Sequence, residues 1–404
     1  MNSLIRYFVS PINTFTIMQA LYSSLKRELH RICYEGQSRY LILTTLGVMF
    51  CYVFFLTLMN EGQPQRLPIA IVDQDGSYLS RRLCHEINAT QGVRVVAVYG
   101  SHTEARRAMQ RQEIYAFLEI PEGTYDELLS FTRPHIVLYS NNAYLLSGSL
   151  SYRSLATISK LASGAVQREV LRKKGYGERQ IMGLIQPIEL DTHLISNPTA
   201  NYQPYVLTTM LPGMLGLSVL LLTIYMIGKE RRRVAGDNQE SDTLAEWLGD
   251  SPYASVLGKL MPYTIWFTLL GVLGNIVLFG WCHFELHGSF WLVALFTLLL
   301  VLAMQSTGVF LAGMIPEAHL STCFGAIYGT LAFTMAGFSY PVTSMPPALQ
   351  ALSQLFPLRH YYKAVSGVSL FGNGLEMCWV QVCALLLFWI AGVIGIYRLK
   401  KQEV

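Results

Sequence analysis

Six long apolar runs, almost free of charge, constrain this chain more than any other feature. A helix needs about 20 apolar residues to cross a bilayer, and a charge at its centre costs roughly 2.5–3.5 kcal/mol. Charged residues make up 14% of the chain, against roughly a quarter in soluble domains. Lys259 is the only charged residue within the runs. They predict six transmembrane helices, at 40–59, 204–228, 257–281, 290–315, 320–340 and 378–397.

Clusters of lysine and arginine predict the orientation of these spans. One cluster precedes the first span, one follows the second and one follows the sixth: Lys26, Arg27, Arg31 and Arg39; Lys229, Arg231, Arg232 and Arg233; Arg398, Lys400 and Lys401. With six spans all three clusters lie on one side, which the positive-inside rule makes cytoplasmic. We therefore expect a multi-pass protein of the inner (plasma) membrane with both termini cytoplasmic, including the tail at 398–404.

The segment 60–203, between the first and second spans, is then extracytoplasmic and reads as an α/β domain. Short runs rich in Val, Ile and Tyr predict strands at 69–73, 93–99, 114–120 and 135–140. A capping box at Ser101 predicts a helix to Gln112, and 145–174 predicts a long helix ended by Gly175. A last extended stretch is expected at 188–195. The fold class is an all-α membrane domain of six helices with an inserted α/β domain.

The N-terminal segment 1–39 contains an amphipathic pattern. Apolar residues recur every three or four positions, at Phe15, Met18, Leu21, Leu25, Leu29 and Ile32. Such a helix is suited to lie in the membrane interface. The alternative is a helix that packs on a neighbouring domain.

Several kinds of chemistry are not supported. The chain has no GxxxxGK[ST] phosphate loop, and its net charge of +4 is too small to suggest nucleic-acid binding. Asp73 to Gly76 resembles the start of a calcium loop, but Cys84 stands where a glutamate is needed. His283, Glu285 and His287 alternate in a short loop and could bind a metal, although a polar hairpin is the favoured interpretation. We expect no catalytic residue, no metal and no cofactor in this chain.

The cytoplasmic segment 229–256 contains a more specific pattern. A short acidic helix with an apolar face is followed by Ser251-Pro252 and then by a Gly-Lys pair entering the third span. This arrangement resembles the permeases of type-2 ATP-binding-cassette (ABC-2) exporters, although Asp242 stands where glycine is usual. The resemblance implies contact with an ATPase by Asp242, Thr243, Leu244, Glu246, Trp247, Leu248, Ser251 and Pro252.

The outer segment 341–376, with four prolines and Met345, resembles the same family and implies a re-entrant outer gate, the alternative being a helix that lies flat on the outer surface. Its candidate residues are Pro341, Met345, Pro346, Leu349, Phe356, Pro357 and Arg359. Proline pairs suit the start of a helix, Pro357 suits its end, and Arg359 is expected at the headgroup level. Mild polar residues within the spans are pathway candidates: Asn275, Gln305, Thr307 and Thr334.

The resemblance covers nearly the whole chain and implies the subgroup with a large extracytoplasmic domain. It implies a permease that moves a drug-like or lipid-like substrate outward, with ATP and Mg bound by a separate ATPase subunit. A second permease, identical or a sibling, and a periplasmic adaptor are further expected partners beside the lipid bilayer. The alternative is a membrane-anchored extracytoplasmic binding or scaffold protein without transport.

Overall fold

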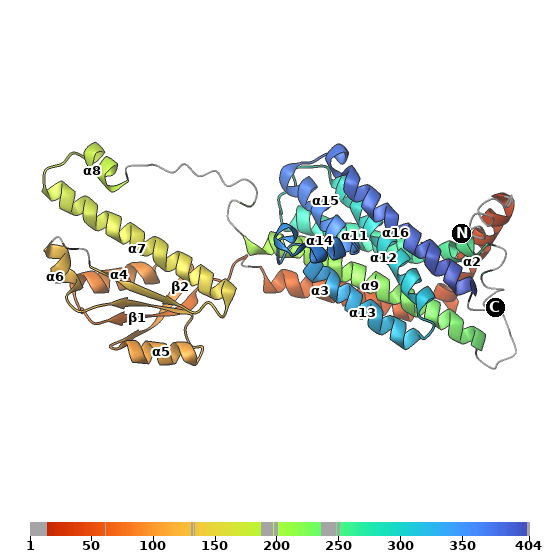
Figure 1. Ribbon diagram of the computed structural model, residues 1–404, viewed down its shortest axis with the longest axis horizontal. Helices are drawn as coiled ribbons and strands as arrows, with labels where there is room; N and C mark the ends of the chain where they lie inside the picture. Colours follow the sequence, from red (N-terminus) through yellow and green to blue (C-terminus); the bar gives the residue numbers. More distant parts are fainter. Residues whose placement is uncertain are drawn as a thin grey trace. The chain divides into compact units, whose positions relative to one another are not determined.

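A computed structural model describes residues 14–60, 62–130, 132, 134–186, 197, 201–235, 248 and 251–401 (Figure 1). The chain divides into two compact units. The helical unit comprises Met1–Asn60 and Leu194–Val404, and the α/β unit comprises Glu61–His193. The expected side of the membrane for each segment stays a prediction.

In the described part of the helical unit, five helices are long and apolar enough to cross a membrane. They are α3 (Ser38–Leu58), α9 (Tyr202–Ala235), α11 (Pro252–Ile276) with the π-helical turn η1 (Val277–Trp281), α12 (Phe290–Met314) and α16 (Leu375–Lys401).

The expected span at 320–340 is only partly matched. The helix there, α13 (Ala318–Met335), has 18 residues, which is about 27 Å of helix. It includes His319, Ser321, Thr322, Thr330 and Thr334, and it is not among the five helices apolar enough to span. The number of six spans is therefore not confirmed.

The helices α9 and α12 lie in the middle of the helical unit, and two-thirds of the apolar window of each is buried. Glycine permits the closest crossings. A Cβ on Gly313 in α12 would overlap the backbone of Gly395 in α16, and one on Gly329 in α13 would overlap Leu217 of α9. Small residues let helix backbones approach where lipid supplies no hydrophobic drive for packing.

The N-terminal helix α2 (Thr14–Tyr34) packs along α11. Its buried side chains are polar, Ser24 and Glu28, whereas Met18, Tyr22 and Leu29 are exposed. The apolar stripe expected from the sequence thus faces partly outward. This distribution suits a helix that packs on the helical unit and presents apolar residues to an interface.

The α/β unit contains a four-stranded sheet in the order β2-β1-β3-β4. The strands are β1 (Leu67–Asp73), β2 (Val93–Tyr99), β3 (Ala116–Ile120) and β4 (Val137–Ser140). β1 pairs in parallel with β2 and β3, and β4 pairs antiparallel with β3. Alternating strands and helices favour a small mixed or parallel sheet, and the structure shows the mixed form.

Helices cover both faces of this sheet (Figure 1). α4 (Tyr78–Asn88) and α7 (Leu145–Lys173) bury one face around Ile69, Ile71 and Leu155, and α5 (His102–Gln110) buries the other around Ala70, Val72 and Phe117. Two short helices, α6 (Thr124–Leu129) and α8 (Glu178–Ile185), complete the unit.

The ends of these helices follow from their sequences. Ser77 and Ser101 accept backbone N–H bonds at the starts of α4 and α5. Gly175, just after α7, has the positive φ of +84° that favours glycine. Sequence reasoning found α5 and α7 but not α4, α6 and α8. The expected extended stretch at 188–195 lies outside the described residues.

Candidate functional site

Four charged side chains from three helices meet inside the helical unit. Lys259 of α11 donates to Glu28 Oε2 of α2 and to Glu230 Oε2 of α9, both at 3.0 Å. Arg31 of α2 donates to both carboxylate oxygens of Glu230, each at 3.1 Å. Glu28 and Lys259 are 1% exposed. We call Glu28, Arg31, Glu230 and Lys259 the charge network.

The network is electrically balanced, with two cations and two carboxylates. Buried charges are tolerated only when they are paired and hydrogen-bonded. Tyr263 supplies a further bond, because its hydroxyl donates to Glu28 Oε1 at 2.8 Å. Removing any one member would leave a buried partner uncompensated.

The polar contacts continue along one face of α11. Ser255, Lys259 and Tyr263 are spaced four residues apart and therefore lie on one face. The Ser24 hydroxyl of α2 donates to the Ser255 carbonyl at 2.7 Å. A Cβ on Gly258 would come within 2.6 Å of the Leu21 carbonyl, so the two backbones are close here. α2 is thus joined to α11 by polar groups over two turns.

The described end of the expected ATPase-coupling segment is attached to the same face. Leu248 is buried among residues of α9, α11, α12 and α16, including Ile227, Val309 and Ile396. The Ser255 hydroxyl donates to the Leu248 carbonyl at 3.0 Å. Ser251 is the N-cap of α11 and Pro252 its first residue. Asp242, Thr243, Leu244, Glu246 and Trp247 lie outside the described residues.

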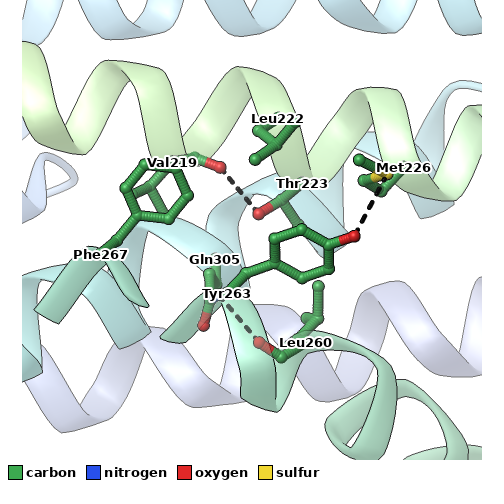
Figure 2. A pocket seen from close by; sticks show the side chains of 8 residues that line it. All are labelled: Val219, Leu222, Thr223, Met226, Leu260, Tyr263, Phe267 and Gln305. Atoms are coloured by element: carbon green, nitrogen blue, oxygen red, sulfur yellow. Dashed lines mark hydrogen bonds between the residues drawn. The ribbon is translucent and has the colours of Figure 1, made fainter. Parts of the chain in front are cut away.

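A narrow gap lies beside Tyr263, between α9, α11 and α12 (Figure 2). Its polar lining consists of Thr223, Tyr263 and Gln305, and the gap leaves no room for a water molecule. Gln305 accepts from Thr264 at 2.7 Å. This pathway candidate is therefore bonded between neighbouring helices in the conformation described.

The other pathway candidates lie apart from it. Asn275 is buried and donates to Thr297 Oγ1 of α12 at 2.8 Å. Thr307 is buried and donates to the Ala303 carbonyl within its own helix. Thr334 is exposed on α13. The structure does not bring these four residues together.

The expected outer gate forms a turn, η2 (Val342–Ser344), and two helices, α14 (Pro347–Ser353) and α15 (Pro357–Phe371). Pro346 caps α14, as expected. Pro357 begins α15 rather than ending the preceding helix, because α14 already ends at Ser353.

Burial along this segment is uneven. Met345 and Phe356 are buried, whereas Leu349 is 38% exposed. Tyr361 of α15 is fully buried, so this helix belongs to the packed helical unit. Pro341 precedes η2 as its N-cap.

Arg359 and His360 of α15 form hydrogen bonds with the end of α14 and with the residue that follows it. Arg359 bonds the Gln350 carbonyl and the Ser353 hydroxyl, at the carboxyl end of α14 where a cation is favoured. Nε2 of His360 donates to the Gln354 carbonyl at 3.0 Å. Burial lowers the pKa of His360, and the nearby cations Arg359 and Lys363 add to that lowering.

Two of the three possible metal ligands in the loop before α12 have other partners. Glu285 accepts from the Asn197 N–H at 3.1 Å, and His287 Nδ1 bonds the Ser369 carbonyl at 3.1 Å. Within the described residues, no three metal-binding side chains come together.

Sequence reasoning missed the charge network. Lys259 was visible as the one charge within a span, and Glu230 as the one acid within a basic cluster. Glu28 lies 202 residues before Glu230, so nothing in the local pattern connects them. A lone lysine in an apolar run is nevertheless a signal, since such a residue needs a partner.

Comparisons with known proteins agree with this architecture. A family model described as ABC-2 family transporter protein matches residues 38–397. The probable multidrug ABC transporter permease YbhR of Escherichia coli K12 is 22% identical over 392 residues, covering 95% of this chain and 99% of the relative. The protein of the same name from Escherichia coli O157:H7 matches equally. Because the family model covers most of its length, the chain belongs to the ABC-2 family of transporter proteins.

Proposed function

We propose that this chain is the membrane permease subunit of an ATP-binding-cassette exporter whose ATP and Mg are bound by a separate ATPase subunit. Membership of the ABC-2 family supports this, as does a relative named as a probable multidrug permease. The single observation that carries the proposal is the run of polar contacts from Leu248 along α11 to α2 and α9.

A movement of the segment before α11 has a route into the membrane helices. Leu248 is buried against four helices and bonded to Ser255. Ser255 and Lys259 then connect α11 to α2 and α9. Charge-assisted hydrogen bonds and bidentate pairs are strong and fix the geometry of the groups that they join, so a displacement of α11 would carry α2 and α9 with it. In this proposal the ATPase contacts residues 242–247 and, through the buried Leu248, moves α11, α2 and α9 together.

The orientation of the helical unit belongs to the same proposal. In α16, the exposed Trp379 lies near the first residue, and Arg398 and Lys400 lie at the other end. Trp281 and Trp291, on either side of the loop before α12, are also exposed. Exposed tryptophan marks a membrane interface, and lysine and arginine favour the cytoplasmic side. This supports cytoplasmic termini in the inner membrane, six spans with α13 as one of them, and an extracytoplasmic α/β unit.

The remaining expectations are proposals of the same kind. Two permeases, identical or siblings, form the pathway, and α14 and α15 form its outer gate. A periplasmic adaptor would bind outside the membrane. The name of the YbhR relative supports a drug-like substrate, and a lipid-like one is equally compatible with the apolar surface of the helices.

Affinity purification of the full chain from its source membranes tests the proposal. An ATPase subunit with a phosphate-binding loop should co-purify in stoichiometric amount. Leu248→Ser should reduce its recovery at least about tenfold, because the residue is buried at the attachment point of the coupling segment. Leu257→Ser, an exposed position on α11, is the matched control. Purification without any ATPase would reject the exporter and favour a scaffold protein.

Orientation is tested by single cysteines. In a variant without native cysteines, a cysteine at Gln110 and one at Asn238 should react with an impermeant reagent from opposite sides of the membrane. Reaction of both from one side would overturn the orientation.

A further inference from the structure

The α/β unit contains an open hollow of about 620 Å³. It lies where β1 and β2 begin and where α4 ends, and its border includes Gln65, Arg66, Thr90 and Arg94. A volume of this size suits a small ligand or a lipid headgroup. The charge network and the coupling segment do not use this part of the molecule.

The border of the hollow is basic. Arg66 and Arg94 both line it, and none of its lining residues is acidic. Both arginines are exposed, and neither guanidinium has a protein partner within the part of the chain that the structure describes. Three other arginines among the described residues of the unit form ion pairs, namely Arg82 with Glu86, Arg111 with Glu113 and Arg168 with Glu178. Two unpaired guanidinium groups at one hollow attract an anion.

The backbone beside the hollow is held in place before any ligand arrives. Arg66 has a φ of +51°, in the left-handed region, and its N–H donates to the Gln91 carbonyl at 3.0 Å. The side-chain amides of Gln91 and Gln65 bond each other at 3.0 Å. A frame fixed in advance lowers the entropy cost of binding, and strained residues gather at ligand sites.

The carboxyl end of α4, which borders the hollow, does not favour the binding of an anion. α4 ends here, and the carboxyl end of a helix favours cations. Carbonyls of its last turn accept from the N–H groups of Ala89 and Thr90, which reduces this effect without reversing it. Binding of an anion must therefore depend on the two arginines.

We propose that Arg66 and Arg94 bind a phosphate-class anion in this hollow. Guanidinium groups are planar forks that bond two oxygens of a phosphate at once. The source of the phosphate is a lipid headgroup or free phosphate. The lipid source is considered because Arg66 follows Leu58, the last residue of α3, by eight positions. The inference requires neither transport nor an ATPase partner.

Calorimetry on the full chain in an uncharged maltoside detergent tests the proposal. The probes are inorganic phosphate, short-chain phosphatidylglycerol below its micelle concentration, and short-chain phosphatidylcholine as the zwitterionic comparison. The test variant is Arg66→Gln with Arg94→Gln. The matched control is Arg81→Gln with Arg82→Gln, which removes the same charge from the first half of α4, away from the hollow.

Saturable binding of phosphate or phosphatidylglycerol is expected, weakening as salt is raised and falling at least about tenfold in the test variant. Binding should be unchanged in the control and partly retained when both arginines are replaced by lysine. Phosphatidylglycerol alone would identify a lipid headgroup, and both probes together would identify the phosphate group itself. Absence of binding, equal loss in both variants, or equal affinity for phosphatidylcholine would overturn the proposal.

Discussion

The two units of this protein are built in opposite ways. In the described residues of the α/β unit, the buried core is apolar and its buried polar side chains are the hydroxyls of Ser80, Thr124 and Ser151. In the helical unit, Glu28, Glu230 and Lys259 are buried, while the exposed residues of α3 include Phe50 and Phe54. Charge turns outward where water surrounds a domain and inward where lipid does.

Glycines of positive φ occur in both units, but close crossings of two helix backbones at glycine are seen in the helical unit among the described residues. In the α/β unit Gly76, Gly123 and Gly175 have positive φ in turns. In the helical unit Gly313 and Gly395 allow helix backbones to touch. Water drives apolar side chains together in the first unit, whereas lipid leaves contact geometry to hold the second together.

The strongest test of this contrast removes the central cation of the charge network. Lys259→Met should destabilise the helical unit by about 3–5 kcal/mol, because two carboxylates lose their common partner in a buried site. Thermal unfolding in detergent with circular dichroism would measure the loss. Lys160→Met, at an exposed position of α7, is the control.

A double variant tests whether the loss of stability comes from breaking the ion pair between Lys259 and Glu28. Lys259→Met with Glu28→Gln should lose less stability than the two single changes together, because the network couples the residues. Purely additive losses would show that the network does not act as a unit.

The apolar core of the α/β unit gives the complementary test. Ile71→Ala should destabilise this unit by about 2–5 kcal/mol, because the side chain is fully buried between the sheet and α4 and α7. Limited proteolysis against urea concentration would report unfolding of the unit. Val98→Ala, at a position 59% exposed, should change little. Equal loss of stability in the helical unit would contradict independent cores.

Disturbing the close packing of α12 against α16 should reduce stability by a smaller amount. Gly313→Ala adds a methyl group that overlaps the backbone of Gly395 and should cost about 1–3 kcal/mol. Gly47→Ala in α3 has nothing within 4 Å of the added atom, so it should be neutral or slightly stabilising through helix propensity. Thermal shift in detergent would compare the two. Similar shifts would refute packing as the role of Gly313.

The smallest expected effect concerns Cys84, the one cysteine of the α/β unit. Burial raises the pKa of its thiol, and the Asp73 carboxylate adds to that rise. Its thiolate fraction at pH 7 is therefore reduced, so alkylation by iodoacetamide should be several-fold slower than at the exposed Cys33 and should rise with pH. Mass spectrometry of the two peptides would follow both rates. Equal rates at pH 7 would contradict the partly buried environment of Cys84.

Local patterns were sufficient for much of the fold. The strand at 93–99 coincides with β2, and the long helix from Leu145 ends before Gly175 as expected. Alternation of β-branched residues and capping signals are short-range properties that one segment contains by itself. Five of the expected spans likewise correspond to helices apolar enough to cross a membrane, since apolar length is a property of one run.

Other elements, such as α4 and the start of α15, became clear only from the tertiary structure. α4, with Ser77 as its cap, has only 11 residues, and its apolar face became clear only from the sheet it covers. Pro357 was expected to end a helix and instead begins α15, because proline suits both the residue after a helix and its first turn.

The charge network shows most clearly which features follow from the sequence and which follow only from the folded chain. The sequence by itself determined that this chain has apolar helices, a basic segment after the second of them and the pattern of an ABC-2 transporter. Only the folded chain brought Glu28, Glu230 and Lys259 within hydrogen-bonding distance. The physical reason is that a charge in an apolar run demands a partner without specifying which residue supplies it, and the packing of α2 and α9 against α11 makes that choice.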